Sequence, residues 1–226
     1  QVPSCLVNAL VATEDARFFE HSGVDSRSLI RVIFKTILFS DRSAGGGSTI
    51  TQQLAKNMYG RKDYPVLSVV LNKSREVILA RRIEKVFTKE EILTLYLNTV
   101  SFGENLYGIE AASQRYFSKP VSGLKVEEAA LLTGMLKANT SFNPRLYPQN
   151  AVRRRNVVLS QMEKYGYIEG RAADSLIALP LKLDYNKTDI SGPADYFLVR
   201  VRTETERILK DLSAFRGKEW DIERDG

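Results

Sequence analysis

Three side chains near the N-terminus have the spacing of one helical face. Glu14, Phe18 and His21 lie at i, i+4 and i+7 in VATEDARFFEHSGVD, next to an apolar stretch. A carboxylate that is partly removed from water binds a proton more readily, which is what a general base requires. The same spacing also describes exposed acidic residues at a helix end, with His21 as a hydrogen-bonded core or capping residue. Spacing alone favours this second interpretation.

A glycine-rich stretch leads into hydroxyl residues and a helix start. In GGGSTITQQLAKN the free amides and the positive end of the helix dipole favour an anion, and Lys56 lies one turn beyond Gln52. No Gly-Lys-Ser/Thr follows the glycines and no clear strand precedes them, so nucleotide binding fits poorly. The segment is either a flexible loop before a capped helix or a site for phosphate or glycan.

Ionisable residues interrupt an apolar stripe in a helix predicted to begin at Pro65. Lys73 lies in the middle of the stripe, Glu76 flanks it and Glu84 follows two turns later. Because a buried unpaired charge is costly, these groups must pair with each other or line a polar cleft. The stripe consists of Val66, Val69, Val70, Val77, Ala80 and Phe87.

The elements that position these residues are predicted to be helices, since apolar residues recur at three and four and no series of alternating strands is evident. Thr49 with Gln52, and Thr88 with Glu91, have capping-box spacing. Helices are predicted over 6–19, 28–40, 49–59, from 65, over 91–98, 108–117, 126–138, 150–165, 171–179 and 194–212. The fold class is therefore mainly α, with a polar boundary at 180–192.

The amino-acid composition limits the kinds of molecule that the chain is expected to bind. The 226 residues carry a net charge of +6, with a pI near 9.3, which suits a membrane surface, a phosphorylated substrate or nucleic acid. One cysteine, Cys5, and one histidine allow neither an internal disulfide nor an ordinary zinc site, and we expect a buried structural thiol. No apolar run approaches the length of about 20 residues that spans a bilayer, and no signal-peptide pattern is present. We expect the chain as given to be soluble or surface-bound.

Five segments, in this order and spacing, closely resemble the motif regions of family 51 glycosyltransferases. That family comprises the peptidoglycan glycosyltransferase domains of class A penicillin-binding proteins and monofunctional transglycosylases, and the similarity covers about residues 2–168. The fifth segment departs from the family at Leu136-Lys137-Ala138-Asn139, which lacks the usual flanking prolines. The segments are ATEDARFFEHSGVD, GGSTITQQLAKN, KSREVILARRIE, ILTLYLNTVSFGENLYGIEAASQRYF and EEAALLTGMLKANTSFNP.

The resemblance implies roles for individual residues. Glu14 is expected to be the general base and Glu76 the second essential carboxylate, while Lys73, with Arg75 beside it, is expected to meet a pyrophosphate. A divalent cation, Mg²⁺ or Mn²⁺, is a family expectation near Glu76, and no organic cofactor is expected. The remaining substrate-binding residues carried over from the family are Asp15, Phe18, His21, Ser48, Thr49, Gln52, Gln53, Lys56 and Asn57.

The resemblance also implies an architecture and a location. A lysozyme-like helical lobe over 1–179 is expected to carry a small membrane-facing jaw at about 24–65, with the apolar basic stretch 28–40 at the membrane surface. Residues 180–226 resemble the linker towards a transpeptidase domain, so the natural protein is expected to be longer at both ends. The implied place is the extracytoplasmic face of a bacterial cytoplasmic membrane.

The implied reaction polymerises lipid II, the lipid-linked disaccharide, into β-1,4-linked glycan with inversion and release of undecaprenyl pyrophosphate. The partners are then lipid II, the nascent glycan strand and the membrane. Two alternatives remain: a lysozyme-like hydrolase with two carboxylates, against which the basic cleft argues, and a non-catalytic basic membrane-binding module. Nucleic acid is not expected, because aromatic residues do not interleave with basic ones.

Overall fold

The computed structural model describes residues 2–27 and 47–186, and these are built almost entirely from helices and turns. The predicted mainly α fold is confirmed for this part of the chain, where the one pairing of extended backbone is a bridge between Ser101 and Tyr107. The predicted helices 28–40 and 194–212, and residues 28–46 of the predicted jaw, lie outside the described residues. In the described part, no helix combines the length and apolar character needed to cross a bilayer.

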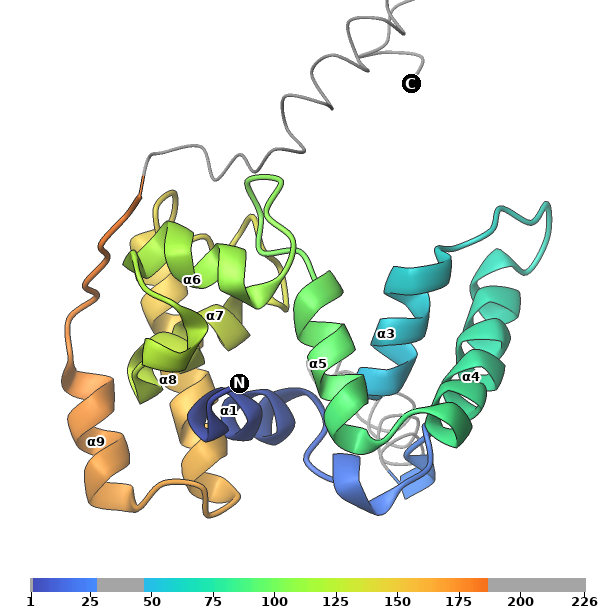
Figure 1. Cartoon of the computed structure of the whole chain (residues 1–226), viewed down its shortest axis with the longest axis horizontal. Coiled ribbons are helices and arrows are strands. Elements are labelled where there is room, and N and C mark those ends of the chain that lie inside the picture. Colours follow the sequence, from blue (N-terminus) through green and yellow to red (C-terminus); the bar gives the residue numbers. More distant parts are fainter. Residues whose placement is uncertain (1, 28–46, 187–226) are drawn as a thin grey trace, which may run out of the picture. The chain divides into compact units, whose positions relative to one another are not determined.

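The described helices form two neighbouring groups in Figure 1. Helices α1, α7, α8 and α9 pack on one another, while α3 packs against both α4 and α5. The element order is α1 Ser4–Glu14, η1 Phe18–Glu20, α3 Ile50–Tyr59, α4 Ser68–Val86, α5 Lys89–Thr99, α6 Ile109–Phe117, η2 Val121–Gly123, α7 Val126–Met135, α8 Pro148–Lys164 and α9 Gly170–Ala178.

Both predicted capping boxes are confirmed. The Thr49 hydroxyl accepts the Gln52 amide at 3.1 Å and the Gln52 side chain accepts the Thr49 amide at 3.1 Å, so α3 starts at Ile50. Thr88 and Glu91 form the same reciprocal pair ahead of α5. Each box satisfies two of the backbone donors that a helix start leaves without an intrahelical partner.

The prediction that the first helix runs to Phe19 is wrong. Helix α1 ends at Glu14, and Asp15 leaves the helical conformation, with φ −157° and ψ 72°. The Asp15 side chain instead accepts the amide of Ile50 at 3.1 Å, so a tertiary contact ends the helix. Glu14, Phe18 and His21 therefore do not share a helical face. Phe18 lies in the following 3₁₀ turn and is fully buried.

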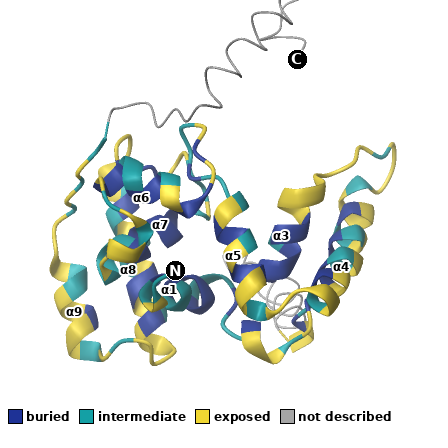
Figure 2. Cartoon of the chain, viewed as in Figure 1, coloured by how far each residue is buried: buried dark blue, intermediate teal, exposed yellow. Residues whose placement is uncertain are grey.

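Helix α4 also differs from its prediction. It begins at Ser68 rather than Pro65, because Leu67 adopts a left-handed conformation (φ 60°) ahead of it. Much of the predicted apolar stripe is exposed: Val69 keeps 80% of its surface in solvent, and Figure 2 shows the exposed side of α4. The buried face consists of Asn72, Glu76, Ala80 and Ile83.

The hydrophobic core crosses both helix groups. Its main cluster contains Leu10 of α1, Leu54 of α3 and Ile92 of α5, all fully buried. A smaller cluster joins α1 to α7 and α8. The shared core fixes the C-terminal end of α1 against the first turn of α3, which is where the candidate site lies.

The compact unit extends to Asn186, beyond the predicted domain end at 179. Amides of Asp184 and Asn186 donate to carbonyls in the last turn of α6, and Tyr185 packs on the core. Near the other end, Cys5 is half-buried against the same core, and burial raises the pKa of its thiol. The thiol therefore fits the structural role that was predicted for it.

Candidate active site

Glu14, the last residue of α1, is held by a chain of two hydrogen bonds. The Gln53 side-chain amide donates to Glu14 Oε2 at 2.9 Å, and the Tyr96 hydroxyl donates to Gln53 Oε1 at 2.9 Å. Burial, reinforced by the charge of Glu14, raises the pKa of Tyr96 far above its usual value. Tyr96 therefore stays a proton donor at any working pH, which orients the Gln53 amide towards Glu14.

A cation approaches Glu14 from the opposite side. Arg154 Nη2, on α8, lies 3.9 Å from Glu14 Oε1, and only 11% of the Arg154 side chain is exposed. Burial lowers the pKa of Arg154, and the Glu14 carboxylate offsets only part of this lowering. A Cβ at Gly134 would lie 3.0 Å from Arg154 Cγ, so glycine leaves room for this side chain. Sequence reasoning missed both Arg154 and Tyr96.

Lys73 is the centre of a second cluster. Its Nζ donates to Ser48 Oγ at 2.7 Å, to Gln52 Oε1 at 3.2 Å and to Glu76 Oε2 at 3.1 Å. Arg61 Nη2 approaches the other oxygen of Glu76 at 3.4 Å. Glu76 is buried, whereas the Arg61 side chain is 60% exposed. Of the two predicted arrangements, the structure therefore shows the ion pair. Its cations, Lys73 and Arg61, remain in contact with solvent.

The first turn of α3 joins the two clusters. Gln53 contacts Glu14, and the preceding residue, Gln52, contacts Lys73. Since α3 belongs to the same core as α1, both predicted carboxylates are connected to its N-terminus, Glu14 directly through Gln53 and Glu76 indirectly through Lys73. A helix N-terminus carries partial positive charge, so it adds to the field of Lys73 on any anion bound there.

Three further predicted residues connect the segment that follows α1 to the start of α3. Asp15, which is buried, accepts the Ile50 amide and contacts His21 Nε2 at 3.0 Å through both carboxylate oxygens. Thr49 donates its hydroxyl to the carbonyl of Gly23 at 2.7 Å. These contacts connect the segment after α1 to the start of α3. Asp15, His21 and Thr49 are therefore supports of the site.

Four predicted residues lie apart from the two clusters. Phe18 is in the core, with Lys89 4.3 Å from its ring centroid. Lys56 and Asn57 are exposed farther along α3. Arg75 donates to the Asn72 side chain at 3.3 Å.

The residues around Glu76 do not fit a divalent cation. Both of its carboxylate oxygens face cationic nitrogens, from Lys73 and Arg61, and no second carboxylate joins them among the described residues. Within 2–27 and 47–186, no three His, Cys, Asp or Glu side chains gather as a metal-binding group. This set of donors suits an anion.

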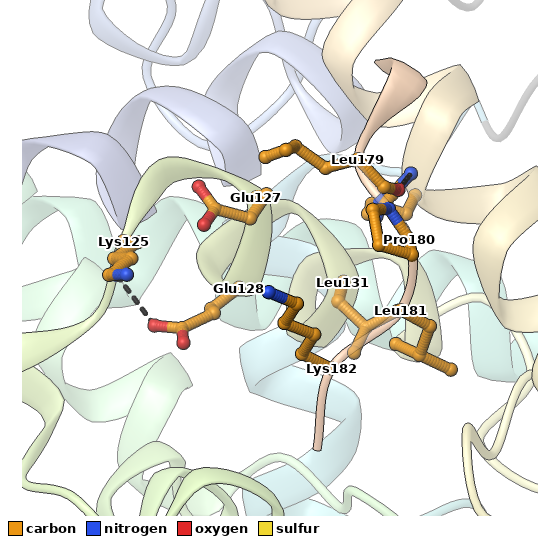
Figure 3. Close-up of a pocket in the computed structure, with 9 residues that line it drawn as sticks. Lys125, Glu127, Glu128, Leu131, Leu179, Pro180, Leu181 and Lys182 are labelled. Carbon is orange, nitrogen blue, oxygen red and sulfur yellow. Dashed lines mark hydrogen bonds between the residues drawn. The ribbon is translucent and has the colours of Figure 1, made fainter. Parts of the chain in front are cut away.

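A separate pocket of about 220 Å³ lies between the start of α7 and the segment that follows α9 (Figure 3). None of the predicted site residues lines it. Its buried wall includes Arg155, whose guanidinium donates to the carbonyls of Ile177 and Leu179. This hydrogen bonding closes the C-terminal end of α9 and gives Arg155 a structural role.

The family comparison covers the part of the chain that carries the two clusters. Residues 1–163 match the model of the transglycosylase family, and the chain belongs to that family. The match contains Glu14, Lys73, Glu76 and the whole of α3.

Individual relatives are penicillin-binding proteins. The chain is 42% identical to penicillin-binding protein 1A of Escherichia coli (strain K12) over 90% of its length, which is 23% of that protein. It is 40% identical to penicillin-binding protein 1A of Aquifex aeolicus (strain VF5), over 90% of this chain and 27% of the relative. Penicillin-binding protein 1F of Bacillus subtilis (strain 168) is 37% identical, over 91% and 28%. The chain spans about a quarter of these relatives.

A crystal structure of penicillin-binding protein 1A from Haemophilus influenzae aligns with 70% of this chain and 20% of its own. The sequence identity over this alignment is 30%, and the TM-score is 0.44.

Proposed function

We propose that this chain is a peptidoglycan glycosyltransferase domain that polymerises lipid II into β-1,4-linked glycan. The observation that carries the proposal is the first turn of α3, which holds Glu14 through Gln53 and Lys73 through Gln52. A base and a cation held by adjacent residues can act on the two ends of one glycosyl transfer. Membership of the transglycosylase family supports the same reaction.

Glu14 is proposed as the general base. Its carboxylate accepts the proton of the attacking sugar hydroxyl as the new glycosidic bond forms and the bond from the anomeric carbon to pyrophosphate breaks. Attack from the face opposite the leaving group converts an α-linked donor into a β-linked product. Gln53 and Arg154 hold the Glu14 carboxylate from two sides, which fixes its direction before substrate arrives.

Lys73 is proposed to stabilise the departing undecaprenyl pyrophosphate. Its Nζ is already oriented by Ser48 and Gln52, and Arg61 adds a second, more exposed cation nearby. Preorganised charge aimed at a developing anion contributes about 3 kcal/mol of barrier lowering per contact. Glu76 keeps Lys73 in place until the phosphate oxygens arrive.

We propose that the domain works at the extracytoplasmic face of a bacterial cytoplasmic membrane, where its lipid substrate would be held. Exposed apolar residues just before α4 and in its first turn, such as Val66 and Val69, lie close in sequence to the basic Arg61 and Lys62. Apolar side chains next to basic ones suit the headgroup region of an anionic bilayer. Because the relatives are longer, a C-terminal transpeptidase domain in the full-length protein is part of the proposal.

Replacing Glu14 by Gln tests the base. We expect Glu14→Gln to lose polymer formation from labelled lipid II by about 100-fold or more, while the far-UV spectrum and binding of the lipid persist. Glu90→Gln, at an exposed position of α5, is the matched control and should keep turnover. Near-normal turnover by Glu14→Gln would show that another group is the base.

Product analysis separates transfer from hydrolysis. Long glycan made from lipid II supports the proposed reaction, whereas cleavage of finished glycan would support a hydrolase. Running the assay with chelator, and then with added Mg²⁺ or Mn²⁺, tests the predicted divalent cation, which takes no part in the steps above.

A further inference from the structure

A nearly buried ion pair between Glu84 and Lys89 contacts the first turn of α3 through Thr51. Lys89 Nζ donates to Glu84 Oε1 at 2.8 Å and to the backbone carbonyl of His21 at 2.7 Å. The two side chains keep only 19% and 7% of their surface exposed. Neither residue belongs to the clusters around Glu14 and Lys73.

The pair connects four separate elements. Glu84 lies near the end of α4 and also accepts the Thr51 hydroxyl, on α3, at 2.6 Å. Lys89 is the first residue of α5, and its ammonium lies 4.3 Å from the ring centroid of Phe18. One ion pair thus holds both α3 and the segment that follows α1.

These contacts lead to the proposed base. Lys89 fixes the backbone of His21, whose ring contacts Asp15, and Asp15 accepts the first amide of α3. Glu84 holds α3 directly through Thr51, which lies two residues before Gln53. The ion pair therefore affects the position of Gln53 relative to Glu14 in two ways: Glu84 holds α3, and Lys89 holds the segment that follows α1.

We infer that Glu84 and Lys89 are positioning residues that set the orientation of Glu14 against α3. This inference rests on the proposed function, but its structural half can be tested without it. A charged pair suits this role because a carbonyl, a hydroxyl and an aromatic face all contact it, and each is directional. Phe18 accordingly contributes to this arrangement through the contact of its ring with the Lys89 ammonium.

The test compares two ion pairs of the same chain. The double variant Glu84→Gln/Lys89→Met removes both charges together, so no buried carboxylate is left unpaired. The matched control is Glu128→Gln/Lys119→Met, which removes a pair with an N–O distance of 2.8 Å that contacts neither Glu14 nor α3. Glu84→Gln alone keeps the acceptor for Thr51 and serves if the double variant folds poorly.

Steady-state kinetics with lipid II supply the first measurement. We expect the turnover number of Glu84→Gln/Lys89→Met to fall by about 100-fold with KM within about twofold, because a shifted base slows chemistry more than binding. The single variant Lys89→Arg, which keeps both charges of the pair, should retain most of the wild-type turnover number. An equal loss in the Glu128→Gln/Lys119→Met control would overturn the inference, since the effect would then be general destabilisation.

The ring of His21 gives a second measurement that is independent of activity. His21 is the single histidine of the chain, so ¹H–¹⁵N correlation spectra of untagged protein report the contact between His21 and Asp15 directly. The ring signals should shift in the Glu84→Gln/Lys89→Met variant and stay in place in the control. Unchanged signals with normal turnover would overturn the inference. Shifted signals with a fully active Glu14→Gln would instead reject only the proposed base.

Discussion

The side chains that prepare Glu14 come from three helices. Gln53 on α3 donates to one carboxylate oxygen, Tyr96 on α5 orients Gln53, and Arg154 on α8 approaches the other oxygen. A carboxylate held in this way has few orientations left to lose when substrate binds. Preorganisation of this kind reduces the entropic cost of reaching the transition state.

Tyr96→Phe tests that preparation at the level of one hydroxyl. Without the donor, the partly buried Gln53 carbonyl loses its hydrogen-bond partner, and its amide is free to turn away from Glu14. We expect a stability loss of about 1 to 2 kcal/mol and a drop in turnover. Urea denaturation and the polymerisation assay measure the two effects.

A second buried tyrosine supplies the comparison. Tyr116 is fully buried, and its hydroxyl donates to the Phe102 carbonyl at 3.3 Å and accepts the Asn143 side-chain amide at 3.2 Å. These two partners are not among the residues that hydrogen-bond to Glu14 or Gln53. Tyr116→Phe should lose similar stability but keep its turnover. If both variants lost activity equally, Tyr96 would have no specific role in orienting Gln53.

At the scale of elements, the two capping boxes have the same chemistry and different surroundings. Thr49 is buried, and its hydroxyl also donates to the carbonyl of Gly23, whereas Thr88 is exposed. Gly23 has φ +85°, and a Cβ there would lie 2.9 Å from the backbone of Ala80. The start of α3 is thus hydrogen-bonded to Gly23, whose backbone is packed tightly against Ala80 of α4.

We therefore expect the two capping threonines to differ in how much stability and turnover their replacement costs. Thr88→Ala should cost about 1 kcal/mol of unfolding free energy and leave turnover unchanged. Thr49→Ala should cost more, because the buried Gly23 carbonyl also loses its donor, and turnover should fall as the first turn of α3 loosens. Thermal melts and kinetics of both variants check this, and equal behaviour would contradict the distinction.

At the scale of the whole compact unit, one carboxylate joins three distant segments. Glu104, in a left-handed turn between α5 and α6, accepts the Tyr185 hydroxyl at 2.6 Å, the Asn143 amide at 3.0 Å and Arg145 Nε at 2.9 Å. Burial alone raises the pKa of Glu104, but these hydrogen bonds and the charge of Arg145 outweigh burial and lower the pKa of the carboxyl below its usual value. Segment 181–186 is held to the helices partly by this group.

The lowered pKa predicts a dependence of stability on pH. The unfolded chain binds a proton at Glu104 more readily than the folded one, so this contribution is fully present above the usual Glu pKa and is lost as pH falls towards the folded value. The stability difference between wild type and Glu104→Gln should therefore be largest near neutral pH and shrink in acid. Urea denaturation at about pH 7 and about pH 3.5 checks this. A constant difference would contradict the assignment.

Local signals determined much of this protein. The capping boxes at Thr49 and Thr88 could be read from sequence because their hydrogen bonds join residues three apart. Most helices follow from periodicity for the same reason: their hydrogen bonds are local. The five ordered segments identified the family, which the comparison confirms.

Tertiary structure decided what lies around Glu14. Asp15 ends α1 because its carboxylate accepts an amide of α3, and no pattern within the first helix announces that contact. Arg154 is distant in sequence and reaches Glu14 only because α8 packs on α1. On α4, periodicity separates two faces but does not say which one meets α3. Glu76 is buried because Lys73 and Arg61 neutralise it there, while valines that could have filled a core face solvent.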